Sequence, residues 1–160
     1  MAHTSVIWVH GNAVEPEEAE HLMRFVRKGW GAQCQGLSGT MHWFHFPLCS
    51  PSVLEGSPMY LSRIYLMYNT RPGGKVDLEP VITAVHVYDG RTLAISFDDL
   101  ALSGVHDESI SAGNILTLNP ALRIANGLGL SVGVEFPQRE KEESISYDIL
   151  FTAAGAEFAS

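Results

Sequence analysis

Residues 83–93 read Thr-Ala-Val-His-Val-Tyr-Asp-Gly-Arg-Thr-Leu. Valines alternate here with His86 and Tyr88, which is the period-two pattern of a β-strand that has one apolar face. The Asp89-Gly90 pair that follows is typical of a tight hairpin, because it supplies the positive φ angles that such a turn needs between twisted strands. The segment therefore predicts two antiparallel strands joined by this turn.

The same alternation recurs along most of the chain. The predicted strands are 3–10, 40–48, 60–69, 81–88, 91–97, 110–118, 128–136 and 144–152. Proline and glycine interrupt them at 47–58 and 69–74, where we expect loops. This pattern predicts an all-β fold, an antiparallel β-sandwich that is jelly-roll-like, with Greek-key connections and at most one short helix. No compositional shift marks a linker, so we expect a single β-sandwich domain over residues 1–160.

The apolar faces of these strands predict the core. Its expected members are Ile7, Val9, Phe44, Phe46, Ile64, Leu66, Val85, Val87, Ile95, Phe97, Leu116, Leu118, Leu130, Val132, Val134 and Phe151.

Residues 16–28 allow two interpretations. Ala19, Leu22, Met23 and Val26 have helical spacing after a run of glutamates, and a basic last turn with a glycine follows, which favours a short helix. The part from 21 to 27 also fits the period-two pairing of a strand. In both interpretations the glutamates form a solvated face.

The composition restricts the class of protein. Of 160 residues, 46% are hydrophobic and 18% are charged, as in a globular protein, and the formal net charge of −8 disfavours nucleic acid as a partner. No apolar segment is long enough to span a membrane, and no export signal precedes the first strand, so we expect no membrane association and a cytoplasmic location. In that compartment Cys34 and Cys49 are expected as free thiols.

Three predicted strands each carry a histidine and an aromatic residue on one face. These pairs are Trp8 with His10, Trp43 with His45, and His86 with Tyr88. Aromatic rings with polar groups beside them can stack against sugars or other small amphipathic molecules, although such rings more often fill a core. We therefore predict these six residues as a candidate ligand-binding face, with the loops 47–58 and 29–39 next to it.

The histidines also raise a metal hypothesis. If the three strands are neighbours in one sheet, His10, His45 and His86 could converge, and three imidazoles can hold zinc with an open position. The spacing matches no local metal motif, so a structural role for these histidines is favoured, and we predict no metal site and no cofactor. We also predict no catalytic residue, since no nucleophile motif is present and the neighbouring carboxylates Asp98 and Asp99 point apart on a strand.

Small residues alternate along the predicted strand 128–136. Gly129, Ser131 and Gly133 share one face, which allows another surface to approach closely. We interpret this face as crowded beneath neighbouring side chains rather than as a surface that contacts a ligand.

Several stretches of the chain resemble a bacterial family of small proteins described only as a domain of unknown function. They are Ala2-His3-Thr4-Ser5, Trp8 to Ala13, Gly29-Trp30-Gly31, Trp43-Phe44-His45, His86 to Gly90, Leu102-Ser103-Gly104 and Ala153 to Phe158. The resemblance implies a single-domain β protein, favours a strand over a helix near residues 22–26, and brings no known activity.

Together these observations predict a non-catalytic binding or interaction domain. Its candidate partner is a carbohydrate or another small amphipathic ligand. Two alternatives remain open: a metal-assisted enzyme that uses the histidine cluster, and a structural subunit that self-associates into a homo-oligomer through an edge strand.

Overall fold

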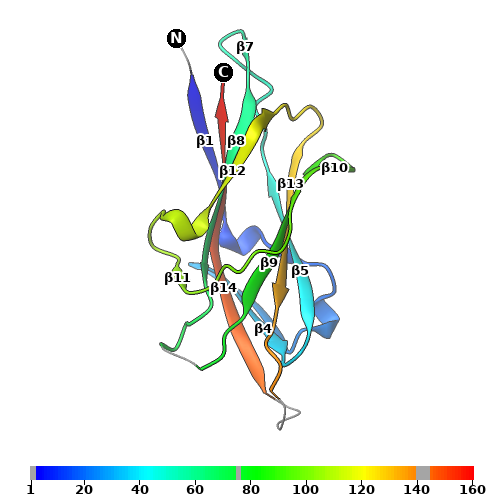
Figure 1. Cartoon of the computed structure of the whole chain (residues 1–160), viewed down its shortest axis with the longest axis vertical. Helices are drawn as coiled ribbons and strands as arrows, with labels where there is room; N and C mark the ends of the chain where they lie inside the picture. The colour runs from blue at the N-terminus through cyan, green and yellow to red at the C-terminus, as the bar shows by residue number, and fades with distance from the viewer. Residues whose placement is uncertain (1–2, 75–76, 140–144) are drawn as a thin grey trace.

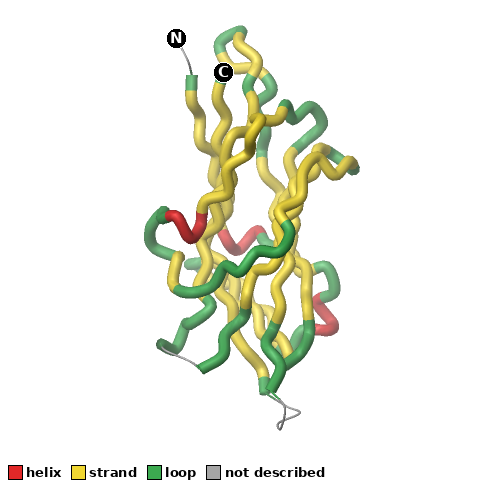
Figure 2. The backbone as a smooth tube through the Cα atoms, in the orientation of Figure 1, coloured by secondary structure: helices red, strands yellow, loops and turns green. Residues whose placement is uncertain are grey.

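Two antiparallel β-sheets pack face to face in the computed structural model, which describes residues 3–74, 77–139 and 145–160 (Figure 1, Figure 2). Every pairing between the described strands is antiparallel. The predicted fold class, an all-β antiparallel sandwich, is confirmed. Beyond the roughly eight strands expected, the described ranges contain several short ones.

The larger sheet contains β1 (Thr4–His10), β3 (Arg24–Lys28), β4 (Gly31–Leu37), β8 (Tyr60–Asn69), β11 (Val105–His106), β12 (Ile115–Leu122) and β14 (Ser146–Ala159). The smaller sheet contains β2 (Glu15–Pro16), β5 (Met41–Leu48), β9 (Val81–Asp89), β10 (Thr92–Phe97) and β13 (Leu128–Glu135), in the order β10-β9-β13-β5-β2. A separate hairpin is formed by β6 (Val53–Leu54) and β7 (Ser57–Pro58). Three short 3₁₀ turns are η1 (Gly11–Ala13), η2 (Ala19–His21) and η3 (Ala112–Asn114).

The long strand β14 organises the larger sheet. It pairs with β8 along one edge, while β4 and β1 share its other edge, β4 opposite residues 146–151 and β1 opposite residues 153–159. The chain passes close to β14 at Gly11, which follows β1, and at Gly31, which begins β4. A Cβ added to either glycine would lie 2.1 Å from the carbonyl oxygen of Phe151. Glycine is therefore required at these two positions.

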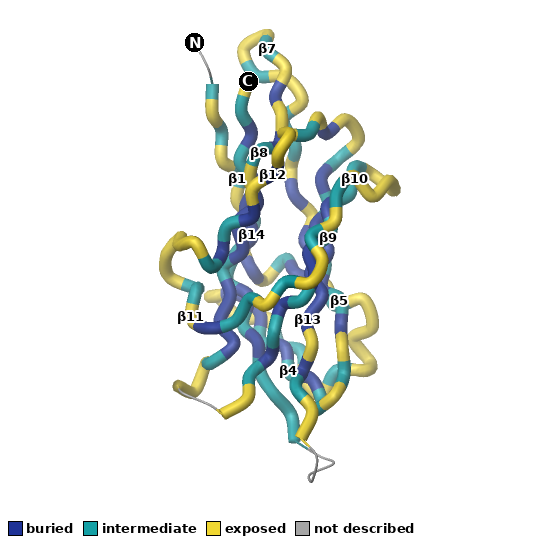
Figure 3. The backbone as a smooth tube through the Cα atoms, viewed as in Figure 1, coloured by how far each residue is buried: buried dark blue, intermediate teal, exposed yellow. Residues whose placement is uncertain are grey.

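The core lies between the two sheets (Figure 3). Phe151 of the larger sheet contacts Phe44 and Phe46 of the smaller sheet, with ring centroids 5.3 and 5.5 Å apart. Twelve of the predicted core residues are buried in this cluster; Val9, Ile95 and Phe97 are half-buried and pack against it. Ile7 is half-buried and is not part of the cluster, so its assignment to the core was wrong.

The hairpin between β9 and β10 is confirmed, with one difference at the turn. Of its residues only Gly90 has a positive φ, +59°, as in two-residue turns whose first position is glycine. Asp89 instead ends β9 opposite Thr92, and its carboxylate accepts hydrogen bonds from the backbone N–H groups of Ala125 and Asn126. These bonds hold the pKa of Asp89 below its usual value.

The helix hypothesis for residues 16–28 is wrong. The segment forms the short turn η2 and then β3, an edge strand that pairs with β4. Phe25 lies opposite Cys34 and packs against the core, so the pairing outweighs the local helical spacing.

Other boundaries also differ from the expectation. Residues 31–37 form β4 rather than part of a loop, because both edges of this segment pair within the larger sheet. The predicted strand 110–118 begins instead with η3, and β12 extends to Leu122. The last strand, expected over 144–152, runs from Ser146 to Ala159, and residue 144 lies outside the described residues.

Both cysteines are free, as predicted. Cys34 is buried and Cys49 is exposed. Burial raises the pKa of the Cys34 thiol, and the nearby Asp148 raises it further. Within the described residues, no helix combines the length and apolar character needed to cross a membrane.

Candidate functional site

A single row of residues crosses the outer face of the smaller sheet. Ser131 of the central strand β13 is the register partner of His45 on β5 and of His86 on β9. Residues opposite one another in a sheet point to the same face. The row continues to Glu15 on β2, which pairs with His45, and to Ser96 on β10, which pairs with His86.

The neighbouring rows place two aromatic residues beside this polar row. Trp43 lies opposite Gly133, and Tyr88 lies opposite Gly129. Both glycines leave space above the central strand. Neighbouring side chains fill this space at Gly133 but not at Gly129. An added Cβ at Gly133 would lie 3.1 Å from the Trp43 ring and 2.9 Å from the Met41 methyl group. The crowding predicted for the small-residue face is therefore present at Gly133.

Gly129 is open. An added Cβ there would meet Tyr88 Cβ at 3.8 Å and no other atom of the described residues within 4 Å. At Gly129 the small-residue face is therefore the floor of a groove. The crowding that we expected for this face is absent at this position.

Two adjoining hollows form the groove. The first has a volume of about 380 Å³ and is lined by Glu17, Trp43, His45, His86, Tyr88 and Ser131. The second, of about 400 Å³, shares His45, Tyr88 and Ser131 with the first and continues over Glu15, Pro47 and Gly129. The groove, defined by these two sets of residues, thus runs across the three central strands of the smaller sheet.

Each imidazole of the groove is oriented by one hydrogen bond, and His45 has in addition a longer contact with a carboxylate. His45 Nδ1 lies 2.8 Å from Ser131 Oγ, and its Nε2 lies 3.4 Å from a carboxylate oxygen of Glu17. His86 Nε2 lies 2.9 Å from Asp98 Oδ1, and the His86 ring packs at a tilt against Trp43 with centroids 4.8 Å apart.

Asp98 adds a carboxylate at the edge of the groove. Hydrogen bonds from His86 and then from Ser96 hold the pKa of this carboxyl below its usual value, so it is ionised at neutral pH.

Ser131, His45 and Glu17 follow the order of a catalytic triad, but the described part of the chain places no free backbone N–H donors beside Ser131 that could form an oxyanion hole. Ser131 lies in a strand that is paired on both sides, so the backbone N–H groups around it are used in the sheet. Acyl transfer needs donors aimed at a developing oxyanion. The arrangement offers hydrogen-bonding groups to a polar ligand.

Trp8 and His10 lie on the other sheet, in β1. The exposed Trp8 ring stacks on Tyr65 with centroids 5.4 Å apart and covers Gly155, where a Cβ would lie 2.7 Å from the indole. His10 Nδ1 accepts a hydrogen bond from the N–H of Asn12 and caps η1. The structure thus brings together four of the six predicted site residues and leaves Trp8 and His10 outside the groove.

The three histidines of the metal hypothesis do not converge, because His10 belongs to the larger sheet and His45 and His86 belong to the smaller one. Among the residues that the structure describes, no group of three or more His, Cys, Asp or Glu side chains could hold a metal ion.

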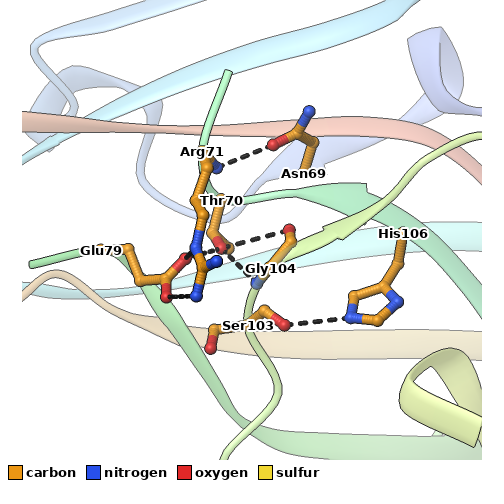
Figure 4. Close-up of polar contacts among 7 residues, drawn as sticks. All are labelled: Asn69, Thr70, Arg71, Glu79, Ser103, Gly104 and His106. Carbon is orange, nitrogen blue, oxygen red and sulfur yellow. Dashed lines mark hydrogen bonds and ion pairs between the residues drawn. The ribbon is translucent and has the colours of Figure 1, made fainter. Parts of the chain in front are cut away.

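A second polar cluster joins the loop after β8 to the loop before β11 (Figure 4). Buried Thr70 donates to a Glu79 carboxylate oxygen at 2.6 Å and accepts from the N–H of Gly104 at 2.7 Å. Arg71 binds the same carboxylate through two nitrogens, at 2.7 and 2.6 Å. The Arg71 guanidinium, together with Thr70, lowers the pKa of Glu79 although partial burial opposes this.

This Thr70-Arg71-Glu79 cluster borders a hollow of about 480 Å³ that also includes Thr83 and Glu135. The Glu79 carboxylate accepts three hydrogen bonds from Arg71 and Thr70 and another from Ser103, so it has little capacity left for a ligand. We interpret the cluster as a clamp between two loops.

Sequence reasoning missed Glu17, Asp98 and Ser131 as parts of the groove. The sequence favours a solvated face for the glutamate run and indicates that Asp98 and Asp99 point apart. The alternation of residues 128–136 does place Ser131 on the small-residue face, but it does not indicate which strands lie beside this one.

The fold and the groove define an all-β sandwich with an open, polar and aromatic depression on one sheet. The chain belongs to a family of unknown function, DUF6623, whose model matches residues 2–160. No curated protein and no solved structure matches the chain.

Proposed function

We propose that the chain is a non-catalytic binding domain that holds a small amphipathic ligand, such as a saccharide, in the groove of the smaller sheet. The observation that carries the proposal is the row His45-Ser131-His86, flanked by Trp43 and Tyr88 around one hollow. Small-molecule sites combine apolar and aromatic walls with a few convergent polar groups.

The dimensions of the groove suit a ring-shaped ligand. His45 and His86 belong to strands separated by the central strand, so their backbones are roughly 10 Å apart, two strand spacings. The floor between them is kept low by Ser131 and Gly129. A six-membered ring that lies on this floor would have the Tyr88 ring at its side and imidazole nitrogens within hydrogen-bonding reach.

The test uses Trp43 as the reporter. A Trp8→Phe/Trp30→Phe variant leaves Trp43 as the sole indole in the protein. We expect a saturable change in its emission when it is titrated with a panel of oligosaccharides and small amphipathic molecules. Adding Tyr88→Ala should weaken the binding, whereas Tyr60→Ala, the same change at an exposed position of the larger sheet, should not.

Two outcomes would contradict the proposal. One is a silent Trp43 signal across the whole panel. The other is a saturable signal whose midpoint is the same with and without Tyr88→Ala. Self-association and a cytoplasmic location stay predictions from the sequence.

A further inference from the structure

Among the described residues of the groove lining, the carboxylates are not matched by lysine or arginine. Glu17 lines the first hollow, Glu15 lines the second, and Asp98 is bonded to His86 at the edge. None of the described residues that line the two hollows is a lysine or an arginine. An ionic ligand in the groove would therefore meet carboxylates.

Arg27, a cation beside this region, does not line either hollow and is engaged by other groups of the protein. Its guanidinium binds the carboxylate of Glu15 and donates to the carbonyl oxygens of Asn12 and Val14 at 2.9 and 3.2 Å. It neutralises Glu15 and leaves Glu17 as the uncompensated carboxylate of the lining.

Glu17 keeps acceptor capacity. Within the described part of the chain, its carboxylate has one partner, His45 Nε2, at 3.4 Å, which is longer than an ordinary hydrogen bond. An ionised carboxylate can accept about four hydrogen bonds. The side chain is also more than half exposed, so a ligand can reach it.

Aromatic residues share the hollow with this carboxylate. Trp43 and Tyr88 line the same 380 Å³ space as Glu17. Rings of this kind attract a cation that lies within about 6 Å of the ring centre, because the ring face carries a partial negative charge. A carboxylate and two electron-rich rings around one hollow is the chemistry that recognises an organic ammonium group.

We propose that the groove selects ligands that carry an organic ammonium group, with this group beside Glu17 and Trp43. The rest of the ligand lies over the second hollow, where Pro47 and Gly129 provide an apolar surface. This inference rests on the proposed function of the groove and names the class of ligand: an amine-bearing saccharide or a quaternary ammonium compound.

Two matched pairs of probes test the charge. Choline is compared with 3,3-dimethyl-1-butanol, which has the same shape without the charge, and a glucosamine oligomer is compared with its N-acetylated form. We expect the cation of at least one pair to bind about tenfold more tightly than its neutral partner by calorimetry, and the responding pair identifies the source of the ammonium group. The preference should shrink as ionic strength rises from about 0.01 M to about 1 M, because the screening length falls from about 30 Å to about 3 Å.

Substitutions test whether Glu17 causes the preference for the cation over its neutral partner. Glu17→Gln should abolish the discrimination between cation and neutral partner, whereas Glu20→Gln, which removes the same charge at an exposed position outside the groove, should leave it unchanged. Trp43→Ala should weaken both members of a pair.

The outcomes separate the two proposals. If the neutral partners bind as tightly as the cations, the ammonium inference is overturned and the groove remains a binding site. A preference that is equally large in Glu17→Gln also overturns it. If neither these probes nor the uncharged panel binds at all, both proposals fail.

Discussion

Ser131 Oγ lies 2.8 Å from His45 Nδ1, across the pairing of β13 with β5. The same serine faces His86 on its other side, so one small residue of the central strand sets the distance between the two imidazoles. The groove is therefore a property of strand order: exchanging either neighbour of β13 would remove it. The two opposite edges of the same sheet carry the carboxylates: Glu17 follows the edge strand β2, and Asp98 follows the edge strand β10.

The loop clamp formed by Thr70, Arg71 and Glu79 predicts a pH-dependent contribution to stability. The pKa of Glu79 is lowered from its usual value of 4.5 in the folded protein. A group with a lowered folded pKa stabilises the protein above its unfolded pKa, and this contribution is lost as the pH falls through the folded pKa. We expect Glu79→Gln to lower the free energy of unfolding by roughly 1–3 kcal/mol at neutral pH, and by progressively less below about pH 4.5.

Urea unfolding from about pH 7 to about pH 3 measures this difference. The control is Glu20→Gln, an exposed glutamate outside the clamp, which should differ little from the unchanged protein at any pH. A Glu79→Gln deficit that stays constant over the whole range would contradict the ionic role of Glu79.

The two cysteines should react very differently with a thiol reagent. Cys49 is exposed, whereas Cys34 is buried in β4 and its thiol pKa is raised by that burial and by Asp148. The thiolate is the reactive form, and burial blocks access to it. We expect a colorimetric disulfide reagent to modify one thiol per native chain and two after denaturation. Cys49→Ser should abolish the native reaction; equal rates for both thiols in the native protein would contradict the burial of Cys34.

Gly11 and Gly31 should tolerate no side chain. A Cβ at either position would lie 2.1 Å from the Phe151 carbonyl oxygen, which is a backbone atom that cannot rotate away. Gly31 in addition has a φ of +151°. We expect Gly11→Ala and Gly31→Ala each to lower the free energy of unfolding by roughly 1–3 kcal/mol or more. Gly73→Ala, at a site with no atom of the described residues within 4 Å, is the control and should stay within about 0.5 kcal/mol in denaturant unfolding.

Strands rich in apolar and aromatic residues were the predictable part of the fold. β8 was predicted at its observed bounds, and β5, β9 and β13 within one residue, because large apolar residues occupy most of their buried positions. β4 was missed because one face of Gly31-Ala-Gln-Cys-Gln-Gly-Leu37 has only small residues and the other has mainly Gly and Gln. What makes this segment a strand is pairing with β3 and β14. The helix expected near 16–28 failed for the same reason: long-range pairing decided the outcome.

The candidate site was predictable only strand by strand. Period two places His86 and Tyr88 on one face, but it cannot state which strand lies beside them. The β9–β10 register also depends on an irregularity between Leu93 and Ile95, which moves Ser96 opposite His86 and brings Asp98 within reach. No glycine or other turn residue marks this bulge, so simple pairing from Gly90 would place Ile95 there instead.

Gly129→Val should close the groove without harming the fold. The position lies in a strand, its φ is not positive, and a Cβ there has open space beside Tyr88. A β-branched residue favours a strand, so we expect the free energy of unfolding to change by no more than about 0.5 kcal/mol. The added methyl groups would occupy the floor between Pro47 and Tyr88, and any ligand of the groove should bind at least about tenfold more weakly.

Thr117→Val, at an exposed position on β12 of the larger sheet, is the matched control and should leave binding unchanged. Unchanged affinity in Gly129→Val, with stability preserved, would mean that the ligand does not lie on the small-residue floor of the smaller sheet.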